Sequence, residues 1–457
     1  MGNLPLDKQH CRQYDLIMSY DDLITKKIRA IRARYYVITF LVWFSTALPL
    51  ALSVLLAQAR GLSLFEVGFA LGVYSLTIVL LEVPTGGLAD AVGRKRVALL
   101  AFVLAALYNL AFLLAFSFPA LLLAMILYGV SRALSSGALD AWFVDALQAV
   151  DPQVDLQPSL AGAESVSLLA LSLGTVIGGA LPRLFTGLPA DGLAIVTPLA
   201  VPLVAALALK LVLVAAVALL IHDDRPAGGA SWRAGLRAVP TLVRQAAGLS
   251  RADPRLLLLM AASFVAGLAV ISLEALWQPF FAALPGISDG NSAPTLLLGV
   301  IMAGNFLVAV AGNLLSVPLS RRWGGRHALV SALSRLLQGA SILALAAAGA
   351  LLPAVGFFWL AYLLGGVGLS PHATLLNAEI PAERRSAMLS VQSLASYLGS
   401  FLGGAGLGYV ADRTSIAVAW AIAGALTVVS LIPYLLLDAR RARPESDRGT
   451  RQLFEQP

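Results

Sequence analysis

Long apolar runs separated by short polar segments fill most of the chain. A helix that crosses a bilayer needs about 20 apolar residues, and these runs are continuous instead of alternating as in membrane β-strands. The pattern predicts an all-α integral membrane protein with twelve transmembrane helices, at residues 35–58, 64–86, 97–116, 119–142, 160–182, 196–221, 256–281, 294–317, 328–350, 352–371, 387–410 and 415–437.

Composition agrees with this pattern. The chain is 59% hydrophobic and 12% charged, whereas soluble proteins carry about 25% charged residues. Such a chain lacks the polar surface that a water-soluble particle of 457 residues needs. The first 34 residues are too long and too polar for a signal peptide, so 35–58 is expected to stay as an uncleaved first span.

The basic residues are distributed unevenly between the two sides of the membrane. Of the 32 Lys and Arg residues, 26 fall in the two tails and the connections on one side; only Arg60, Arg183 and Arg413 fall on the other. Because basic loops stay in the cytoplasm, we expect both termini there. The net charge of +7 therefore reflects topology and contact with anionic lipid, and no nucleic-acid partner is needed to explain it.

The longest internal connection divides the chain near its midpoint, which suggests two six-helix halves. LGxxxGG recurs at an offset of 225 residues, with Gly174, Gly178 and Gly179 in the fifth span and Gly399, Gly403 and Gly404 in the eleventh. Such small residues allow close helix packing. The predicted parts are a cytoplasmic tail at 1–34, a bundle at 35–221, a central cytoplasmic loop at 222–255, a second bundle at 256–437 and a cytoplasmic tail at 438–457.

The connection after the second span carries the most specific motif. Residues 86–96 read GGLADAVGRKR, which resembles the signature of the major facilitator superfamily between spans two and three. The resemblance covers essentially the whole chain and implies two pseudo-symmetric six-helix halves that transport by alternating access. It also implies a lock on the cytoplasmic side formed by Gly86, Asp90, Gly93, Arg94 and Lys95.

Ionisable residues within the spans are costly in a bilayer and usually face a cavity or a partner. Arg132 resembles an arginine of proton antiporters in that family, although the expected glycine four residues later is Ser136. Asp140 and Asp145 lie nearer the level of Asp90. Together with Glu82 they suggest a charge network that couples transport to protons; no role is assigned to Lys210, Glu164 and Arg335.

The seventh span offers the best candidate for a substrate site. Glu274, Trp277, Gln278 and Phe281 follow at helical spacing and therefore share one face. Aromatic rings with one acid suit an amphipathic or cationic molecule. The alternative is that Trp277 anchors the helix at the headgroups. Trp43 and Asn305 are further cavity candidates.

These observations predict a secondary transporter of a small organic solute, with proton-coupled efflux of an amphipathic or drug-like compound as the first hypothesis. The alternatives are a proton-linked importer of a small nutrient and, more distantly, a polytopic membrane enzyme or a non-transporting receptor. No catalytic motif, metal site, ATP site or cofactor is expected. We expect a monomer in the plasma (inner) membrane, and the excess of Arg over Lys favours a bacterial source.

Overall fold

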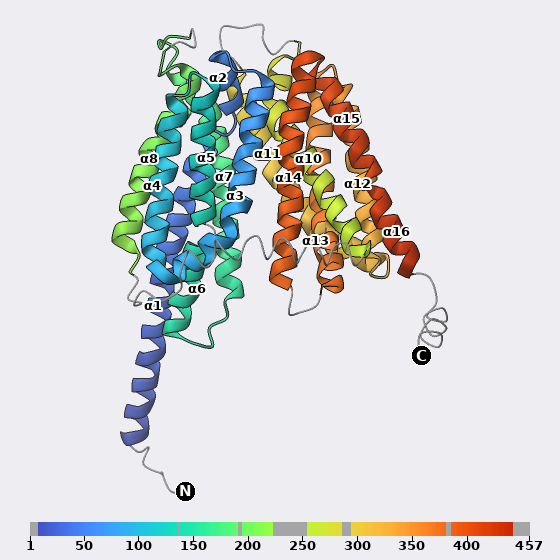
Figure 1. Cartoon of the computed structure of the whole chain (residues 1–457). Coiled ribbons are helices and arrows are strands. Elements are labelled where there is room, and N and C mark those ends of the chain that lie inside the picture. The colour runs from blue at the N-terminus through green and yellow to red at the C-terminus, as the bar shows by residue number, and fades with distance from the viewer. Residues whose placement is uncertain are drawn as a thin grey trace, which may run out of the picture.

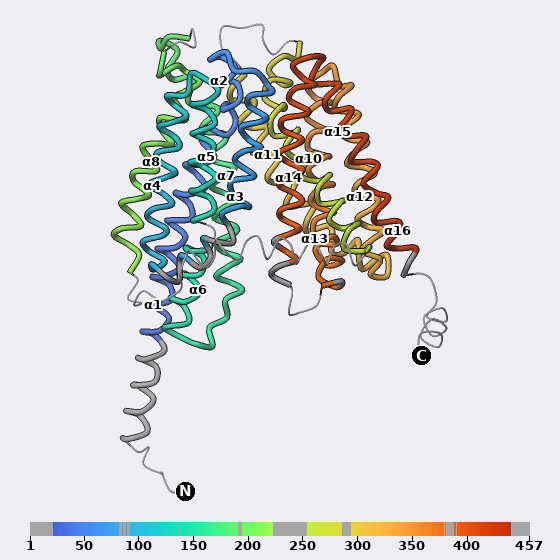
Figure 2. Tube along the Cα trace, viewed as in Figure 1, coloured from blue at the N-terminus to red at the C-terminus, as the bar shows by residue number. Residues whose placement is uncertain are grey.

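The computed structural model is built from helices (Figures 1 and 2). It describes the backbone of residues 8–135, 137–190, 194–222, 254–285, 294–380 and 385–441. The central part of the predicted loop at 222–255 and most of the predicted C-terminal tail lie outside the described residues.

The first group of helices precedes the central loop. Its members are α1 (Lys8–Ala47), α2 (Ser53–Ala59), α3 (Leu64–Val92), α4 (Arg94–Leu113), α5 (Phe118–Ser135), α6 (Ala138–Val150), α7 (Gln157–Ala180) and α8 (Val201–Leu220), with short 3-10 turns η1 (Leu181–Leu184) and η2 (Pro198–Ala200).

The second group follows the central loop. Its members are α10 (Pro254–Ala282), α11 (Thr295–Arg322), α12 (His327–Ala346), α13 (Leu351–Glu379), α14 (Arg385–Arg413), α15 (Ile416–Val429) and α16 (Leu431–Arg441).

Every predicted span coincides with helical structure, and the all-α membrane fold is confirmed. Within the described residues, ten segments are long and apolar enough to cross a membrane. The predicted spans 35–58 and 387–410 are not among them. Glycines and serines lower the mean hydropathy of α14, and the break between α1 and α2 shortens the apolar helix of the first span. The total of twelve therefore stays a prediction.

Three predicted spans are interrupted. The first breaks between α1 and α2, where Pro49 follows Leu48 and the chain turns. The fourth breaks at Gly137, whose φ of +85° begins α6, and the last breaks at Ser430 between α15 and α16. The predicted tail at 1–34 is also helical from Lys8 onward, because α1 continues beyond the apolar run.

The two groups of helices stand side by side, with α1–α8 on the left and α10–α16 on the right of Figure 1. Between them α3 packs on α14, and α7 packs on α11. The groups lie close together at the upper end, near α2, and spread apart toward the lower end, near α6 and α16 (Figure 1). We call these the closed end and the open end.

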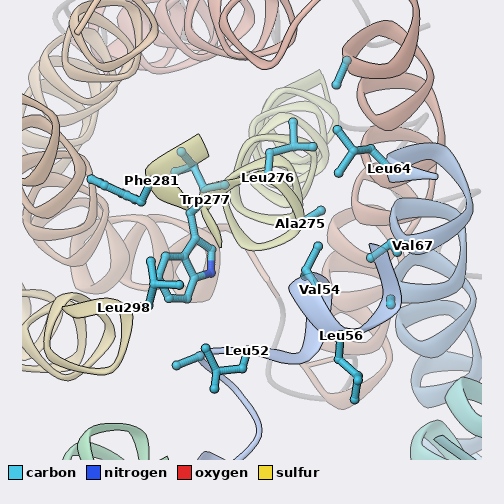
Figure 3. Close-up of a cluster of buried hydrophobic side chains, with 14 of the residues drawn as sticks. Leu52, Val54, Leu56, Leu64, Val67, Ala275, Leu276, Trp277, Phe281 and Leu298 are labelled. Carbon is cyan, nitrogen blue, oxygen red and sulfur yellow. The ribbon is translucent and has the colours of Figure 1, made fainter. Parts of the chain in front are cut away.

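Buried apolar residues follow the same division. One cluster contains residues of both groups, including Leu52, Val67, Trp277 and Leu298, and unites them at the closed end (Figure 3). Toward the open end each group has its own cluster, around Phe143 in the first and around Tyr434 in the second. The halves therefore share a core at one end only.

Candidate functional site

Three adjoining cavities lie between the two groups of helices, with volumes of about 820, 780 and 300 Å³. They share lining residues. Arg132 lines the two larger cavities, and Glu274 and Tyr74 line the 820 Å³ and the 300 Å³ cavities. Trp43 lines the 780 Å³ and the 300 Å³ cavities. We refer to the three together as the central cleft. Its size suits small organic molecules, for which pockets of about 300–1,000 Å³ are typical.

Trp43 and Arg132 meet at the wall formed by the first half. The Arg132 guanidinium carbon lies 5.1 Å from the centre of the Trp43 ring, a cation–π contact between α5 and α1. Among the described residues no carboxylate forms an ion pair with Arg132. The guanidinium is therefore held in place by an aromatic face, and its charge remains directed at the cleft.

Glu274 projects from α10 into the cleft, where its side chain is exposed although it lies within a predicted span. Opposite it stand the stacked rings of Tyr74, Tyr128 and Tyr108, with centroid separations of 4.6 Å and 4.3 Å between neighbours. No described side chain forms an ion pair with Glu274. A carboxylate facing an aromatic wall is suited to binding an organic cation.

The two aromatic residues of the predicted substrate-binding face of the seventh span are buried. Trp277 and Phe281 are 2% and 0% exposed and belong to the core at the closed end (Figure 3). Trp277 also lines the smallest cavity. A side chain this buried does not face headgroups, so the alternative of an interfacial anchor is wrong.

Gln278 joins the two halves. Its amide oxygen accepts from the Val54 N–H at 2.9 Å, and its amide nitrogen donates to the Leu50 carbonyl at 2.9 Å. The Leu50 carbonyl belongs to the break between α1 and α2 and the Val54 N–H to the first turn of α2, so neither has the full set of helical partners. The amide that looked available for a substrate is thus committed to stabilising this break.

Asn305 and Lys210 are buried. Asn305 on α11 contacts the Met302 sulfur and lines none of the three cavities. Lys210 on α8 lines the smallest cavity and donates to Thr46 Oγ1 at 2.9 Å and to the Val42 carbonyl at 3.2 Å. Its ammonium group is thereby tied to α1 without an acidic partner among the described residues.

The described acids of the predicted charge network lie at two places. Asp140 accepts a hydrogen bond of 2.5 Å from the Tyr35 hydroxyl and, with Glu164, lines the 780 Å³ cavity. Asp145 instead forms an ion pair with Arg94. The side chain of Glu82 lies outside the described residues.

The motif of residues 86–96 spans the end of α3 and the start of α4. Gly93 has a φ of +101° and begins α4, a backbone conformation that glycine adopts readily. Arg94 reaches Asp145 on α6, and the Lys95 ammonium donates to the Ala218 carbonyl of α8 at 2.7 Å. Gly86 lies in the last part of α3, and the Asp90 side chain lies outside the described residues.

The repeated glycines occupy equivalent places in the two halves. A Cβ on Gly174 or Gly178 would collide with α1, and one on Gly399 or Gly403 would collide with α10. The last glycine of each repeat touches the other half. Gly179 meets Thr295 and Gly299 of α11, and Gly404 meets the backbone of Gly68 in α3.

Sequence reasoning missed the surroundings of two polar groups. Asp412 on α14 accepts from the backbone N–H groups of Leu64 and Phe65 at 3.0 and 2.7 Å and so caps α3 of the other half. His372 on α13 is hydrogen-bonded by Ser263 and Tyr434. A Ser63-x-x-Glu66 capping box marks the start of α3 in the sequence, but nothing there points to Asp412.

The comparison with protein families identifies the chain. The model of the Major Facilitator Superfamily matches residues 35–378 and 268–456. The chain belongs to the Major Facilitator Superfamily. The predicted family resemblance is therefore confirmed, and the protein is a multi-pass membrane protein of a transporter family. No match is found among curated protein sequences.

Solved structures share the fold at low identity. The nucleoside transporter NupG superposes with a TM-score of 0.71 at 16% identity, over 89% of this chain and 98% of that one. A bacterial homologue of the human lysosomal transporter Spinster, in an inward-facing and occupied conformation, gives 0.66 at 16% identity, over 90% and 95%. A POT family transporter in complex with 5-aminolevulinic acid gives 0.66 at 13%, over 91% and 100%.

No group of three or more His, Cys, Asp or Glu side chains suited to a metal ion occurs in the part of the chain that the structure describes.

Proposed function

We propose that this protein is a secondary active transporter that exports a small amphipathic organic solute by alternating access, driven by inward movement of protons. The observation that carries the proposal is Glu274, an ionisable side chain exposed in a cleft between two helical groups that share a core only at one end. A cleft of this kind can present a site to one side of the membrane and then to the other.

The lining of the cleft supports an amphipathic solute. The stacked tyrosines and Trp43 offer apolar surface, and Glu274 offers one negative charge to a cationic group. Such a mixture of aromatic surface and few polar groups is typical of sites for small organic molecules. The structures of similar fold include a nucleoside transporter and a transporter in complex with 5-aminolevulinic acid, which are both proteins that handle small organic solutes.

Acidic residues support coupling to protons. Glu274, Asp140 and Glu164 all line the cleft, and none forms an ion pair with a described side chain. A carboxylate that loses water on closure binds a proton or a cationic group more tightly, so exchange of one for the other links the two movements. Asp140, in contact with Tyr35, is the first candidate for this exchange.

The predicted topology supports export as the proposed direction. The open end lies on the side of α6 and α16, which the distribution of basic residues predicts to be cytoplasmic. A cleft open to the cytoplasm can collect a solute there and release it outside. An importer would use the same cleft in reverse, and the sign of the proton movement distinguishes the two.

The test uses proteoliposomes that contain the purified full chain and a pH-sensitive dye in the lumen. An aromatic amphipathic cation such as ethidium is added outside to wild type and to Glu274→Gln. We expect solute uptake with proton release from the lumen in wild type. Loss of a charge-assisted contact, worth about 1.5–3 kcal/mol, should lower uptake by Glu274→Gln about tenfold or more.

Asp22→Asn serves as the control because it removes an exposed carboxylate of α1 that pairs with Lys26 at the surface, far from the cleft. It should transport as wild type does. Unchanged uptake by Glu274→Gln would contradict the proposed role of Glu274. Cotransport of protons with the solute would indicate the importer.

A further inference from the structure

Arg335 is a buried cation in the second half that the proposed function does not use. It lies in the middle of α12, is 8% exposed and lines the 820 Å³ cavity. One terminal nitrogen donates to Gln338 Oε1 at 2.8 Å, one helical turn along. Its Nε is buried without a hydrogen-bond partner.

The groups around Arg335 are polar but contain no described carboxylate. Gln338 is held by the Ala361 carbonyl at 3.1 Å, and the neighbouring Tyr434 hydroxyl lies 2.9 Å from His372 Nδ1. The other ring nitrogen of His372 lies 3.0 Å from the hydroxyl of Ser263. Amide and hydroxyl groups orient the guanidinium but do not neutralise it, and no described acid forms an ion pair with Arg335.

A buried charge of this kind is unfavourable without a counter-charge, particularly at bilayer depth. Replacing such an arginine by an apolar residue of similar volume would improve stability if packing were its only role. A guanidinium also presents a planar pair of donors that matches a carboxylate. The geometry therefore favours an anionic group that reaches Arg335 through the cavity.

Glu274 lines the same cavity from α10, with a charge of the opposite sign. No ion pair is formed between Glu274 and Arg335, so each remains available to a different part of one ligand. The same cavity is also lined by hydroxyl and amide groups, among them Ser396, Ser400 and Gln392. The cavity thus offers one acidic and one basic anchor on a polar wall.

We propose that Arg335 binds a carboxylate of the transported solute while Glu274 binds its cationic group, so that the substrates are amphoteric organic molecules such as amino-acid-like compounds. This inference rests on the proposed function, which it narrows from amphipathic cations to solutes that carry both charges. Gln338 is a positioning residue that orients the guanidinium.

The experiment measures thermal unfolding of the purified full chain in detergent with three matched probes, each over a concentration series. Phenylalanine carries both charges, phenylalaninamide only the cationic one and N-acetylphenylalanine only the anionic one. A ligand that binds the folded state raises the unfolding temperature. Phenylalanine should stabilise wild type at the lowest concentration, and removal of either charged group should weaken apparent binding about tenfold or more.

The variants are Arg335→Met, Arg335→Lys and the control Arg322→Gln, which changes an exposed residue at the end of α11. Without ligand, Arg335→Met should unfold at the same or a higher temperature than wild type. It should bind phenylalanine no better than phenylalaninamide. Arg335→Lys should recover part of the difference, and Arg322→Gln should behave as wild type.

Three results would overturn the inference. The first is lower stability of Arg335→Met without ligand, which would show a structural arginine. The second is that phenylalanine and phenylalaninamide stabilise wild type equally, or that neither of them stabilises it. The third is equal stabilisation by chloride or by phosphatidylglycerol micelles alone, which would show a site for an inorganic anion or a lipid phosphate.

Transport of the same probes into proteoliposomes separates this inference from the proposed function. If uptake depends on Glu274 but is equal for phenylalaninamide and phenylalanine, the proposed function stands and the inference is overturned. Stabilisation by phenylalanine through Arg335 without uptake of any probe would overturn the transport proposal and leave the anion site.

Discussion

The closed end and the open end of the interface between the halves are formed by different kinds of residue. At the closed end, backbones touch through Gly68 and Gly404, and one apolar core contains residues of both halves. Toward the open end, each half keeps a separate core, and the cleft between them is lined by Arg132, Glu274 and Asp140. Small and apolar residues thus form the core and the backbone contacts of the closed end, whereas the walls of the cleft carry charged side chains.

The difference shows how the interface can be stable and still reversible. Close contact between glycines is favourable without strong polar bonds, so it can be lost without leaving buried charges unpaired. The contact is also repeated: Gly404 meets Gly68 on one side of the interface, and Gly179 meets Gly299 on the other. The two glycine contacts therefore occupy equivalent places in the two halves.

The most damaging change to the closed end should be Gly404→Leu. A Cβ at this position collides with the backbone of Gly68, which cannot move aside as a side chain would. A cost of about 3 kcal/mol lowers the population with this end shut by about 100-fold. We therefore expect transport to be lost and the two halves to move apart at this end.

Spin labels measure this separation. They are attached through the substitutions Ala59→Cys and Thr414→Cys, which change exposed residues of the first and second half, in a chain that also carries Cys11→Ser. Gly406→Leu is the control, because it lies on the same helix as Gly404 and a Cβ there meets nothing within 4 Å. In Gly406→Leu the distance between the two spin labels should equal that in the labelled chain without this substitution. An unchanged distance in Gly404→Leu would show that this contact does not hold the closed end together.

A smaller effect is expected for Gln278→Leu. The change removes both hydrogen bonds to the break between α1 and α2 and leaves the buried Val54 N–H unsatisfied. A loss of about 2 kcal/mol should open the closed end about 30-fold more often. The measurement is the rate of thiol labelling in a chain with Cys11→Ser and Ala70→Cys, because Ala70 of α3 is fully buried in the shared core and becomes accessible only when the closed end opens. Gln58→Leu, which alters a partly exposed residue of α2, should not change that rate.

The smallest effect is expected for Asp412→Ala. It removes the cap that α14 supplies to the first N–H groups of α3, while the Ser63–Glu66 capping box remains. Loss of a cap costs about 1 kcal/mol, or about fivefold in closed-end opening. Asp412→Asn retains an acceptor oxygen and should fall between wild type and Asp412→Ala in the same labelling assay. Equal rates in all three proteins would show that the cap does not hold the halves together.

The open end has one surface feature with little expected influence on transport. Arg326, between α11 and α12, forms an ion pair with Asp438 of α16, and hydrogen bonding to this partner raises the pKa of Arg326 above its ordinary value. The contribution of a cation with a raised pKa is complete below its ordinary pKa and is lost only as pH rises beyond it. This pair therefore adds no pH dependence in the physiological range.

The order of residues along the chain was enough to predict the fold class, the helices and the family. Apolar runs of helical length place the spans because a lipid environment requires every backbone group to be bonded within a helix. Residues 86–96 pointed to the Major Facilitator Superfamily, and the repeated glycines pointed to close packing at equivalent places in the two halves.

Which polar residues face the cleft depended on how the helices pack. Helical spacing placed Glu274, Trp277, Gln278 and Phe281 on one face. Glu274 is exposed in the cleft, whereas Trp277 and Gln278 line its smallest cavity but are buried, the one in the core and the other against backbone groups. Asp412 gave no local signal, and Arg335 was recognisable only as a charge within a span, because their surroundings come from helices distant in the chain. The residue types set the cost of burying a charge, but only the packed helices determine which partner, if any, that charge meets.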